Sequence, residues 1–210
     1  MGEFRHAVKA IVAIAVIVLA GTAGIVAAGR DAAPAPGAPG LRTSALPDGL
    51  ARTAAPRIRL PDARGGTFDS RTLAGRPYLV TFVYTHCRDV CPVIGEDIAA
   101  ALRRLGPRAR GTAALAISVD PRGDTPAAAR RWLATHRLPR QVHYLVGSRE
   151  ELAPVWQDWF LAPEGERRLD SASHAAGIWL VDARGGLRGR WSAGAPVDPG
   201  DLAHDLAALR

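Results

Sequence analysis

Between residue 56 and the last residue, short apolar runs alternate with longer amphipathic stretches. Apolar runs of five to seven residues predict buried strands, and they cover Tyr78–Tyr84, Ala113–Val119 and Val142–Val146. Helix-start signals follow each run. They predict helices from near Cys91 to Leu105, stopped by Gly106-Pro107, from Asp124-Thr125-Pro126 onward, and from Ser148 through Phe160.

Further apolar runs flank this series on both sides. Short strands are expected before it, at Arg57–Leu60 and Thr67-Phe68. A hairpin and a last helix are expected after it: strands Ile178–Asp182 and Leu187–Trp191 around the turn Ala183–Gly186, then a helix from Asp198-Pro199 to Leu209. This order predicts an α/β fold with a mainly parallel sheet, helices on both faces and an antiparallel edge.

The N-terminal segment contains nineteen consecutive residues without a charge, residues 10–28, after Arg5 and Lys9. A helix of that length spans roughly 28 Å, close to the hydrocarbon thickness of a bilayer. The preceding positive charges favour a cytoplasmic head, residues 1–9, and an extracytoplasmic remainder. A cleaved signal peptide is the alternative, because Val26-Ala27-Ala28 is an acceptable cleavage site. Either way, the rest of the chain is exported to a compartment in which thiols tend to oxidise.

Residues 29–55 are rich in Ala, Pro and Gly and predict a semi-extended linker, which leaves residues 56–210 as one domain of ordinary size. The formal net charge is +7, from 27 Lys and Arg against 20 Asp and Glu. The arginines are scattered rather than gathered in a run with interleaved aromatics, so a nucleic-acid surface is not expected. The charge could favour anionic lipid headgroups or acidic partners without identifying one.

The two cysteines of the chain, Cys87 and Cys91, directly follow a predicted strand and stand where a helix is expected to begin. Reactive groups in α/β sheets gather at the carboxyl ends of strands. A thiol at a helix N-terminus has a lowered pKa, and residues four apart share a helix face. The pair can therefore close a disulfide or hold a soft ion such as Cu(I) with a third ligand. A purely structural bridge is the alternative, although structural bridges usually close longer loops.

Two of the six histidines are candidates for the third ligand. His86 is adjacent to Cys87. His174 lies in a loop of small residues that leads into the strand beginning at Ile178. The other four, His6, His136, His143 and His204, fit ordinary positions in the head, in predicted helices or at the start of a strand. The residues alone leave the choice between His86 and His174 open.

Three segments together resemble the Sco/SenC family. They are Val83-Tyr-Thr-His-Cys-Arg-Asp-Val-Cys-Pro92, Ser118-Val-Asp-Pro-Arg-Gly-Asp-Thr-Pro126, and Ser173-His174 before Gly177-Ile-Trp-Leu-Val-Asp182. These proteins are membrane-anchored copper chaperones that serve assembly of the dinuclear copper centre of cytochrome c oxidase. The resemblance covers residues 56–210. It implies a thioredoxin-like fold, with a central sheet flanked by helices, and copper ligands Cys87, Cys91 and His174.

The resemblance implies a single-pass protein of the cell membrane that delivers Cu(I) or Cu(II) to cytochrome c oxidase subunit II or its assembly factors. Binding and transfer would then proceed without catalytic turnover. Zinc fits less well, because three ligands near an open surface make a leaky zinc site. An exported thiol–disulfide oxidoreductase that acts on cysteines of the oxidase or of other proteins is the alternative, with Cys87 and Cys91 as its redox pair. A peroxidase is a third possibility, but Tyr84 stands where its Thr or Ser is usual.

Overall fold

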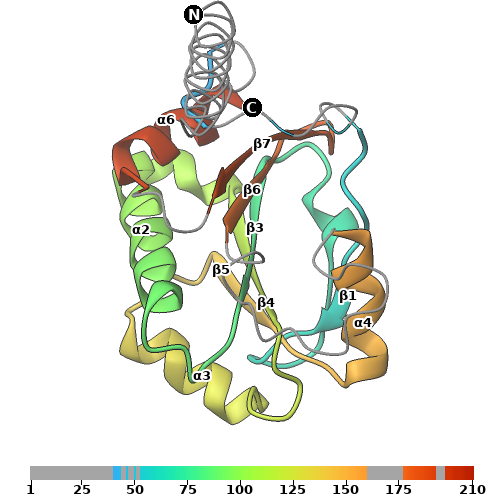
Figure 1. Cartoon of the computed structure of the whole chain (residues 1–210). Coiled ribbons are helices and arrows are strands. Elements are labelled where there is room, and N and C mark those ends of the chain that lie inside the picture. The colour runs from blue at the N-terminus through green and yellow to red at the C-terminus, as the bar shows by residue number, and fades with distance from the viewer. Residues whose placement is uncertain (1–39, 44–45, 47–49, 51–52, 160–176, 193–196) are drawn as a thin grey trace, which may run out of the picture. The chain divides into compact units, whose positions relative to one another are not determined.

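A five-stranded mixed sheet with the strand order β5-β4-β3-β6-β7 forms the centre of the domain (Figure 1). The computed structural model describes residues 40–43, 46, 50, 53–159, 177–192 and 197–210. The strands are β3 (Tyr78–Val83), β4 (Ala113–Ser118), β5 (Val142–Leu145), β6 (Gly177–Val181) and β7 (Leu187–Ser192). β3, β4 and β5 run parallel, whereas β6 pairs antiparallel with both β3 and β7. The expected parallel sheet with an antiparallel hairpin at one edge is confirmed.

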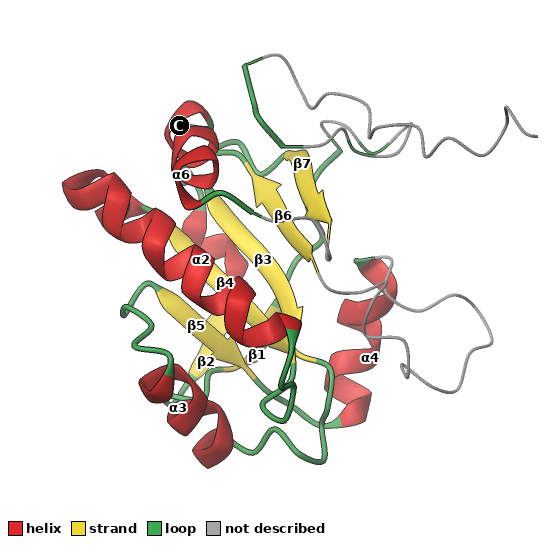
Figure 2. Ribbon diagram, turned by 60° about the vertical axis from the view of Figure 1, so that its left-hand side comes forward, coloured by secondary structure: helices red, strands yellow, loops and turns green. Residues whose placement is uncertain are grey.

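Helices cover both faces of this sheet (Figure 2). Their bounds are Val90–Leu105 for α2, Pro126–Thr135 for α3, Arg149–Asp158 for α4 and Pro199–Ala208 for α6. Residues of α2, α3 and α6 share one buried cluster with the sheet, and residues of α4 share the other. The second cluster also contains Leu60 from a small hairpin of β1 (Arg59–Pro61) and β2 (Thr67–Asp69).

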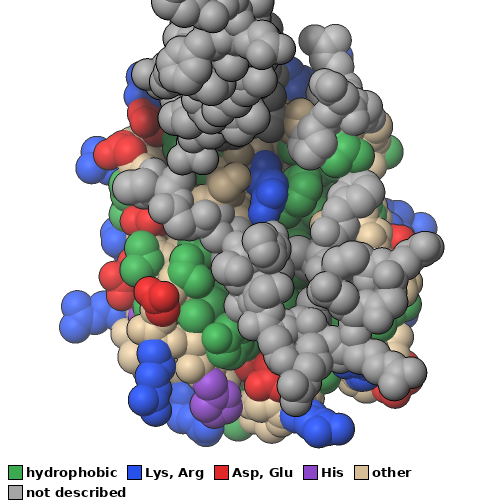
Figure 3. All heavy atoms as spheres, in the orientation of Figure 1, with side chains coloured by type: hydrophobic (Ala, Val, Ile, Leu, Met, Phe, Trp, Pro, Cys, Tyr) green, Lys and Arg blue, Asp and Glu red, His purple; other side chains and the backbone are tan. Residues whose placement is uncertain are grey.

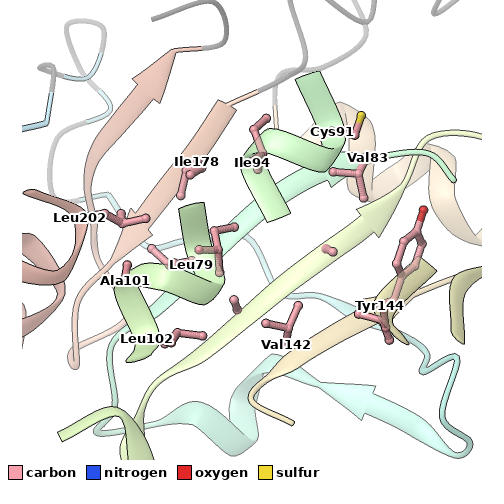
Figure 4. Packing of buried hydrophobic residues seen from close by; sticks show 14 of the residues in the cluster. Leu79, Val83, Cys91, Ile94, Ala101, Leu102, Val142, Tyr144, Ile178 and Leu202 are labelled. Carbon is pink, nitrogen blue, oxygen red and sulfur yellow. The ribbon is translucent and has the colours of Figure 1, made fainter. Parts of the chain in front are cut away.

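The two clusters follow from the alternation of side chains along each strand. Leu79 of β3 packs in the cluster with α2, whereas its neighbour Val80 packs in the cluster with α4. Every residue of β3 and β4 is buried, as expected for parallel strands that are covered on both faces. Figure 4 shows Cys91 at the end of the first cluster, beside Val83, with the Tyr144 hydroxyl at the same end. The core thus extends up to the cysteines.

Several predicted boundaries were wrong. The strand expected at residues 57–60 is β1, which begins at Arg59. The α-helix ends at Leu105 as predicted, but the chain continues as a 3-10 helix, η3 (Gly106–Gly111), because Pro107 fits the first turn of a helix. A second short 3-10 helix, η2 (Ser70–Leu73), was not predicted. The helix from Ser148 has the predicted capping box and ends at Asp158, while Phe160 lies outside the described residues.

The predicted head and membrane anchor, residues 1–28, lie outside the described residues, as does most of the predicted linker. In the described part of the chain, no helix combines the length and the apolar character needed to cross a bilayer. The described linker residues lie against the domain. The Arg42 and Thr43 amides both donate to the buried carboxylate of Asp205, at 2.8 and 2.9 Å, and Leu46 is buried in the cluster with α4.

Candidate functional site

Cys87 and Cys91 lie in the junction between β3 and α2, at the carboxyl end of the parallel strands. The helix begins at Val90, so Cys91 belongs to its first turn and Cys87 precedes it. The expectation that both thiols share a helix face was therefore wrong. The loop brings them together instead: the Cys87 amide donates to the Tyr84 carbonyl at 3.2 Å, and the Cys91 amide donates to the Cys87 Sγ at 3.3 Å.

The Cys87 sulfur thus takes the place of a capping oxygen at the start of α2. Asp89 occupies the N-cap position, but its side chain makes no capping hydrogen bond. The first amides of a helix have no partner within the helix and favour a negative charge nearby. A sulfur atom that accepts a hydrogen bond from one of these amides is stabilised as a thiolate. The thiolate is the form that attacks disulfides and binds metal ions.

The two thiols differ in acidity. Burial alone would raise the pKa of Cys87, but hydrogen bonds from the Cys91 thiol, the Asp89 and Cys91 amides and the Tyr84 hydroxyl outweigh burial and lower it. Burial, and then the hydrogen bond to Cys87, raise the pKa of Cys91 to about 12. Cys87 is 7% exposed and Cys91 2% exposed, and neither is in a disulfide. Cys87 is therefore the more acidic of the two thiols, and Cys91 is the less exposed partner that holds its proton more firmly.

A buried carboxylate, Asp124, fixes the loop that carries the thiols. Asp124 is 3% exposed and accepts three hydrogen bonds: from the Thr85 amide at 2.7 Å, the Ser118 hydroxyl at 2.6 Å and the Tyr144 hydroxyl at 2.9 Å. The donors come from the loop after β3, from β4 and from β5. The cap residue predicted directly before Pro126 is confirmed as Thr125, whose hydroxyl accepts a hydrogen bond from the Ala128 amide, so Asp124 is not the cap of this helix. No sequence signal distinguished the buried carboxylate from a cap.

His86 lies near carboxylates. Its ligand atom and those of Asp120 and Asp124 all lie within 4.8 Å of one another, and no thiol belongs to this group of described residues. The group is tightly packed: a Cβ atom at Gly123 would lie 2.2 Å from the Asp120 Oδ2 and 3.0 Å from the His86 Nδ1. His86 itself is exposed. His86 thus already lies beside two carboxylates and beside the Thr85 hydroxyl, whose Oγ1 is 3.4 Å from its Nδ1, which makes it a less suitable third ligand for the thiol pair.

His174, the histidine predicted as a ligand, lies outside the described residues. The strand that follows it is described, however. In the antiparallel pairing of β6 with β3, Ile178 lies opposite Thr81, two residues before the end of β3. The chain therefore enters β6 at the same end of the sheet at which β3 leads into the Cys87 loop.

The comparisons with known proteins agree with this fold. The SCO1/SenC family model matches residues 50–209. Protein SenC of Rhodobacter capsulatus is 27% identical over 126 residues, which cover 59% of this chain and 56% of that protein. The chain therefore spans little more than half the length of this relative.

Two solved structures are informative about the fold. The copper-bound structure of Bradyrhizobium japonicum ScoI matches with a TM-score of 0.62 and 29% identity, over 75% of this chain and all of that one (100%). A thiol:disulfide interchange protein of the thioredoxin family from Chlorobium tepidum matches with a TM-score of 0.56 and 18% identity, over 75% of this chain and 96% of that one. The predicted thioredoxin-like fold with a sheet flanked by helices is confirmed.

The difference in acidity predicts selective modification of the thiols. At neutral pH, iodoacetamide should alkylate Cys87 well before Cys91, because only the thiolate reacts and the pKa of Cys87 is lowered while that of Cys91 is raised. The rate at Cys87 should rise with pH to a plateau whose midpoint lies below the ordinary thiol value of about 8.5. Peptide mass spectrometry of timed samples measures both rates. Equal rates at the two positions would contradict the assignment.

Proposed function

The chain belongs to the SCO1/SenC family, and we propose that it is a membrane-anchored copper chaperone that carries copper on Cys87, Cys91 and His174. The observation that supports this most directly is the pair of buried, unbridged thiols at the carboxyl end of β3. The names of similar structures, such as the copper-bound ScoI, point to the same cargo.

The proposed ligands suit copper chemically. Two sulfur ligands match the soft Cu(I) ion, and an imidazole completes the trigonal coordination that Cu(I) accepts; the same set can hold Cu(II). The Cys87 Sγ is already held against a backbone amide, so one ligand is fixed before the ion arrives. Binding must displace the proton of Cys91, whose pKa is raised to about 12, so copper binding releases protons.

Copper is the cargo in this proposal, so the site must also release it. Three ligands leave the ion open to attack by the ligands of a receiving protein, whereas a closed four-ligand cage would retain it. We propose that the receiver is cytochrome c oxidase subunit II, at its dinuclear copper centre, or an assembly factor of that subunit. Hydrophobic side chains gather over α2 on the face seen in Figure 3, and Val93, two residues after Cys91, is 55% exposed.

A thiol–disulfide oxidoreductase is the second candidate function, and the unequal acidity of the thiols favours it. In that reaction the Cys87 thiolate attacks a disulfide of a partner protein, and one partner sulfur leaves as a thiolate. Cys91 then loses its proton and attacks Cys87, which releases the second partner sulfur and leaves a Cys87–Cys91 disulfide. The partner is reduced by two electrons and the pair is oxidised by two. The partner cysteines could be those of the oxidase subunit before it receives copper.

The His174→Ala variant separates these functions. If His174 is a copper ligand, the substitution should weaken Cu(I) binding by more than the ~10–100-fold that is typical of losing a residue beyond the ligands. The Cys87–Cys91 pair should still form a disulfide. A competition titration with a Cu(I) chelator and the rate of thiol–disulfide exchange measure the two properties.

His86→Ala is the matched control, because His86 is the imidazole next to the thiols in sequence. It should bind copper like the parent chain. The ligand assignment fails if His86→Ala loses copper while His174→Ala keeps it. The oxidoreductase becomes the better assignment if neither variant loses copper and both exchange disulfides more slowly.

We also propose that residues 10–28 anchor the protein in the cell membrane as a single span, with residues 56–210 on the extracytoplasmic side. The uninterrupted apolar sequence after Arg5 and Lys9 supports this. The full-length chain should therefore remain in the membrane fraction after washing at alkaline pH or high salt. Recovery of a soluble protein whose N-terminus is Gly29 would show instead that the segment is a cleaved signal peptide.

A further inference from the structure

The end of the sheet opposite the cysteines carries a cluster of arginines. Two backbone hydrogen bonds of 3.0 Å connect three segments there: the Gly75 amide donates to the Ala183 carbonyl, and the Ala183 amide donates to the Leu209 carbonyl. Each of these three residues is followed by an exposed arginine, and the three are Arg76, Arg184 and Arg210. Segments that are far apart in the sequence thus bring three arginine-bearing turns to one end of the sheet.

The cluster extends to both sides of this junction. A Cβ atom at Gly111 would lie 3.7 Å from the Arg76 side chain, so η3 borders the cluster and adds exposed Arg108 and Arg110. On the other side, a hollow of about 270 Å³ is lined by Arg184, Arg188 and Arg210 among others. We call the six arginines the cationic face: Arg76, Arg108, Arg110, Arg184, Arg188 and Arg210.

The charges of this face are little compensated. Asp182 lines the hollow and accepts a hydrogen bond of 3.0 Å from the Arg188 side chain. The same carboxylate also accepts hydrogen bonds from backbone amides of its own turn. The charges of the cysteine end are more evenly balanced. Its exposed or half-exposed charges include Arg88, Arg122, Arg130 and Arg149 and, against them, Asp89, Asp120, Glu150 and Glu151. Positive charge is therefore less compensated at the cationic face than at the cysteine end.

The chain segment that comes from the predicted anchor is fastened to the cationic end. The Ala55 amide donates to the Gly185 carbonyl at 2.8 Å, and the Leu187 amide donates to the Thr53 carbonyl at 2.9 Å, so both bonds hold the segment to the β6–β7 turn. Figure 1 places the C terminus at the end of the sheet away from α3. If residues 10–28 span the membrane, only residues 29–39 remain between the anchor and the described chain, and they reach at most ~40 Å.

We propose that the cationic face docks on the anionic phospholipid headgroups of the membrane. Arginines bind phosphate oxygens with two parallel hydrogen bonds, and several basic residues on one surface add their attractions to an anionic leaflet. The location at the membrane rests on the proposed anchor, while the docking rests on the arginines. A six-residue strand separates the two ends by about 20 Å, more than the screening length of about 8 Å at physiological salt. Docking would therefore hold Cys87 away from the membrane, toward proteins in the aqueous compartment.

Hydrogen–deuterium exchange of the full-length chain in lipid nanodiscs tests this docking. One nanodisc contains only phosphatidylcholine and the other also contains phosphatidylglycerol. Peptides covering residues 106–111 and 182–188 should exchange more slowly with phosphatidylglycerol, and high salt should remove the difference. Peptides around Cys87 should exchange alike in both. Equal exchange of the arginine-bearing peptides in the two nanodiscs would overturn the proposal.

Matched variants identify the groups responsible. Replacing Arg108, Arg110 and Arg184 with glutamine should abolish the lipid-dependent protection, since each arginine contributes about five-fold to partitioning onto an anionic surface. Replacing three exposed arginines elsewhere with glutamine (Arg122, Arg131 and Arg149) changes the net charge equally and should leave the protection intact. If both variants lose the lipid-dependent protection equally, the effect depends only on net charge, and the proposal that the cationic face is the docking surface is overturned.

Two further experiments distinguish membrane docking from the binding of a soluble anion, and the docking proposal from the proposed copper function. If inorganic phosphate protects residues 182–188 in phosphatidylcholine nanodiscs as strongly as phosphatidylglycerol does, the site binds a soluble anion and the membrane docking is wrong. Cu(I) titration of the same samples tests the proposed function separately. Parental copper affinity in a variant that has lost lipid protection is the expected result. If the parent protein does not bind Cu(I) but keeps its lipid-dependent protection, the proposed chaperone function is overturned and the proposed membrane docking stands.

Discussion

The arrangement of the thiol site depends on the three hydrogen bonds that the buried Asp124 carboxylate accepts. A carboxylate taken out of water is strongly destabilising unless polar partners replace its hydration, so its donors must stay where they are. One donor is the Thr85 amide, two residues before Cys87, while Ser118 and Tyr144 belong to the rigid sheet. The loop is thereby tied to β4 and β5, and the Cys87 sulfur is held against the start of α2.

The consequence of this fixed geometry is a pair of thiols with different roles. Cys87 precedes α2 and has a lowered pKa, whereas Cys91 lies in the first turn of α2, is less exposed and has a raised pKa. Such a pair can present one ready sulfur ligand to copper, or one nucleophile to a disulfide, with the same atoms in the same places. The third group decides between these uses. An imidazole from the segment before β6 would complete a copper site, and without it the pair retains only thiol chemistry.

Much of the fold could be predicted from the sequence, because buried strands such as Tyr78–Val83 and capped helices such as the one after Ser148 carry local signals. The details of the site could not. Asp124 has the sequence context of a helix cap, and only the tertiary structure shows that it is buried among hydroxyl groups from other strands. Cys87 was expected on the helix, but this residue lies before the helix, and its sulfur caps the helix start. The cationic face was equally hidden, since its arginines come from four separate segments. His174 as a ligand remains a prediction.

X-ray absorption at the copper edge of the full-length protein loaded anaerobically with Cu(I) tests the central claim most directly. The account predicts two sulfur scatterers and one imidazole nitrogen per copper. The sulfur shell should disappear in a Cys87→Ser, Cys91→Ser double variant, and the imidazole scattering should be lost in His174→Ala but kept in His86→Ala. A copper environment of oxygen and nitrogen alone, or a spectrum that the double cysteine variant leaves unchanged, would contradict it.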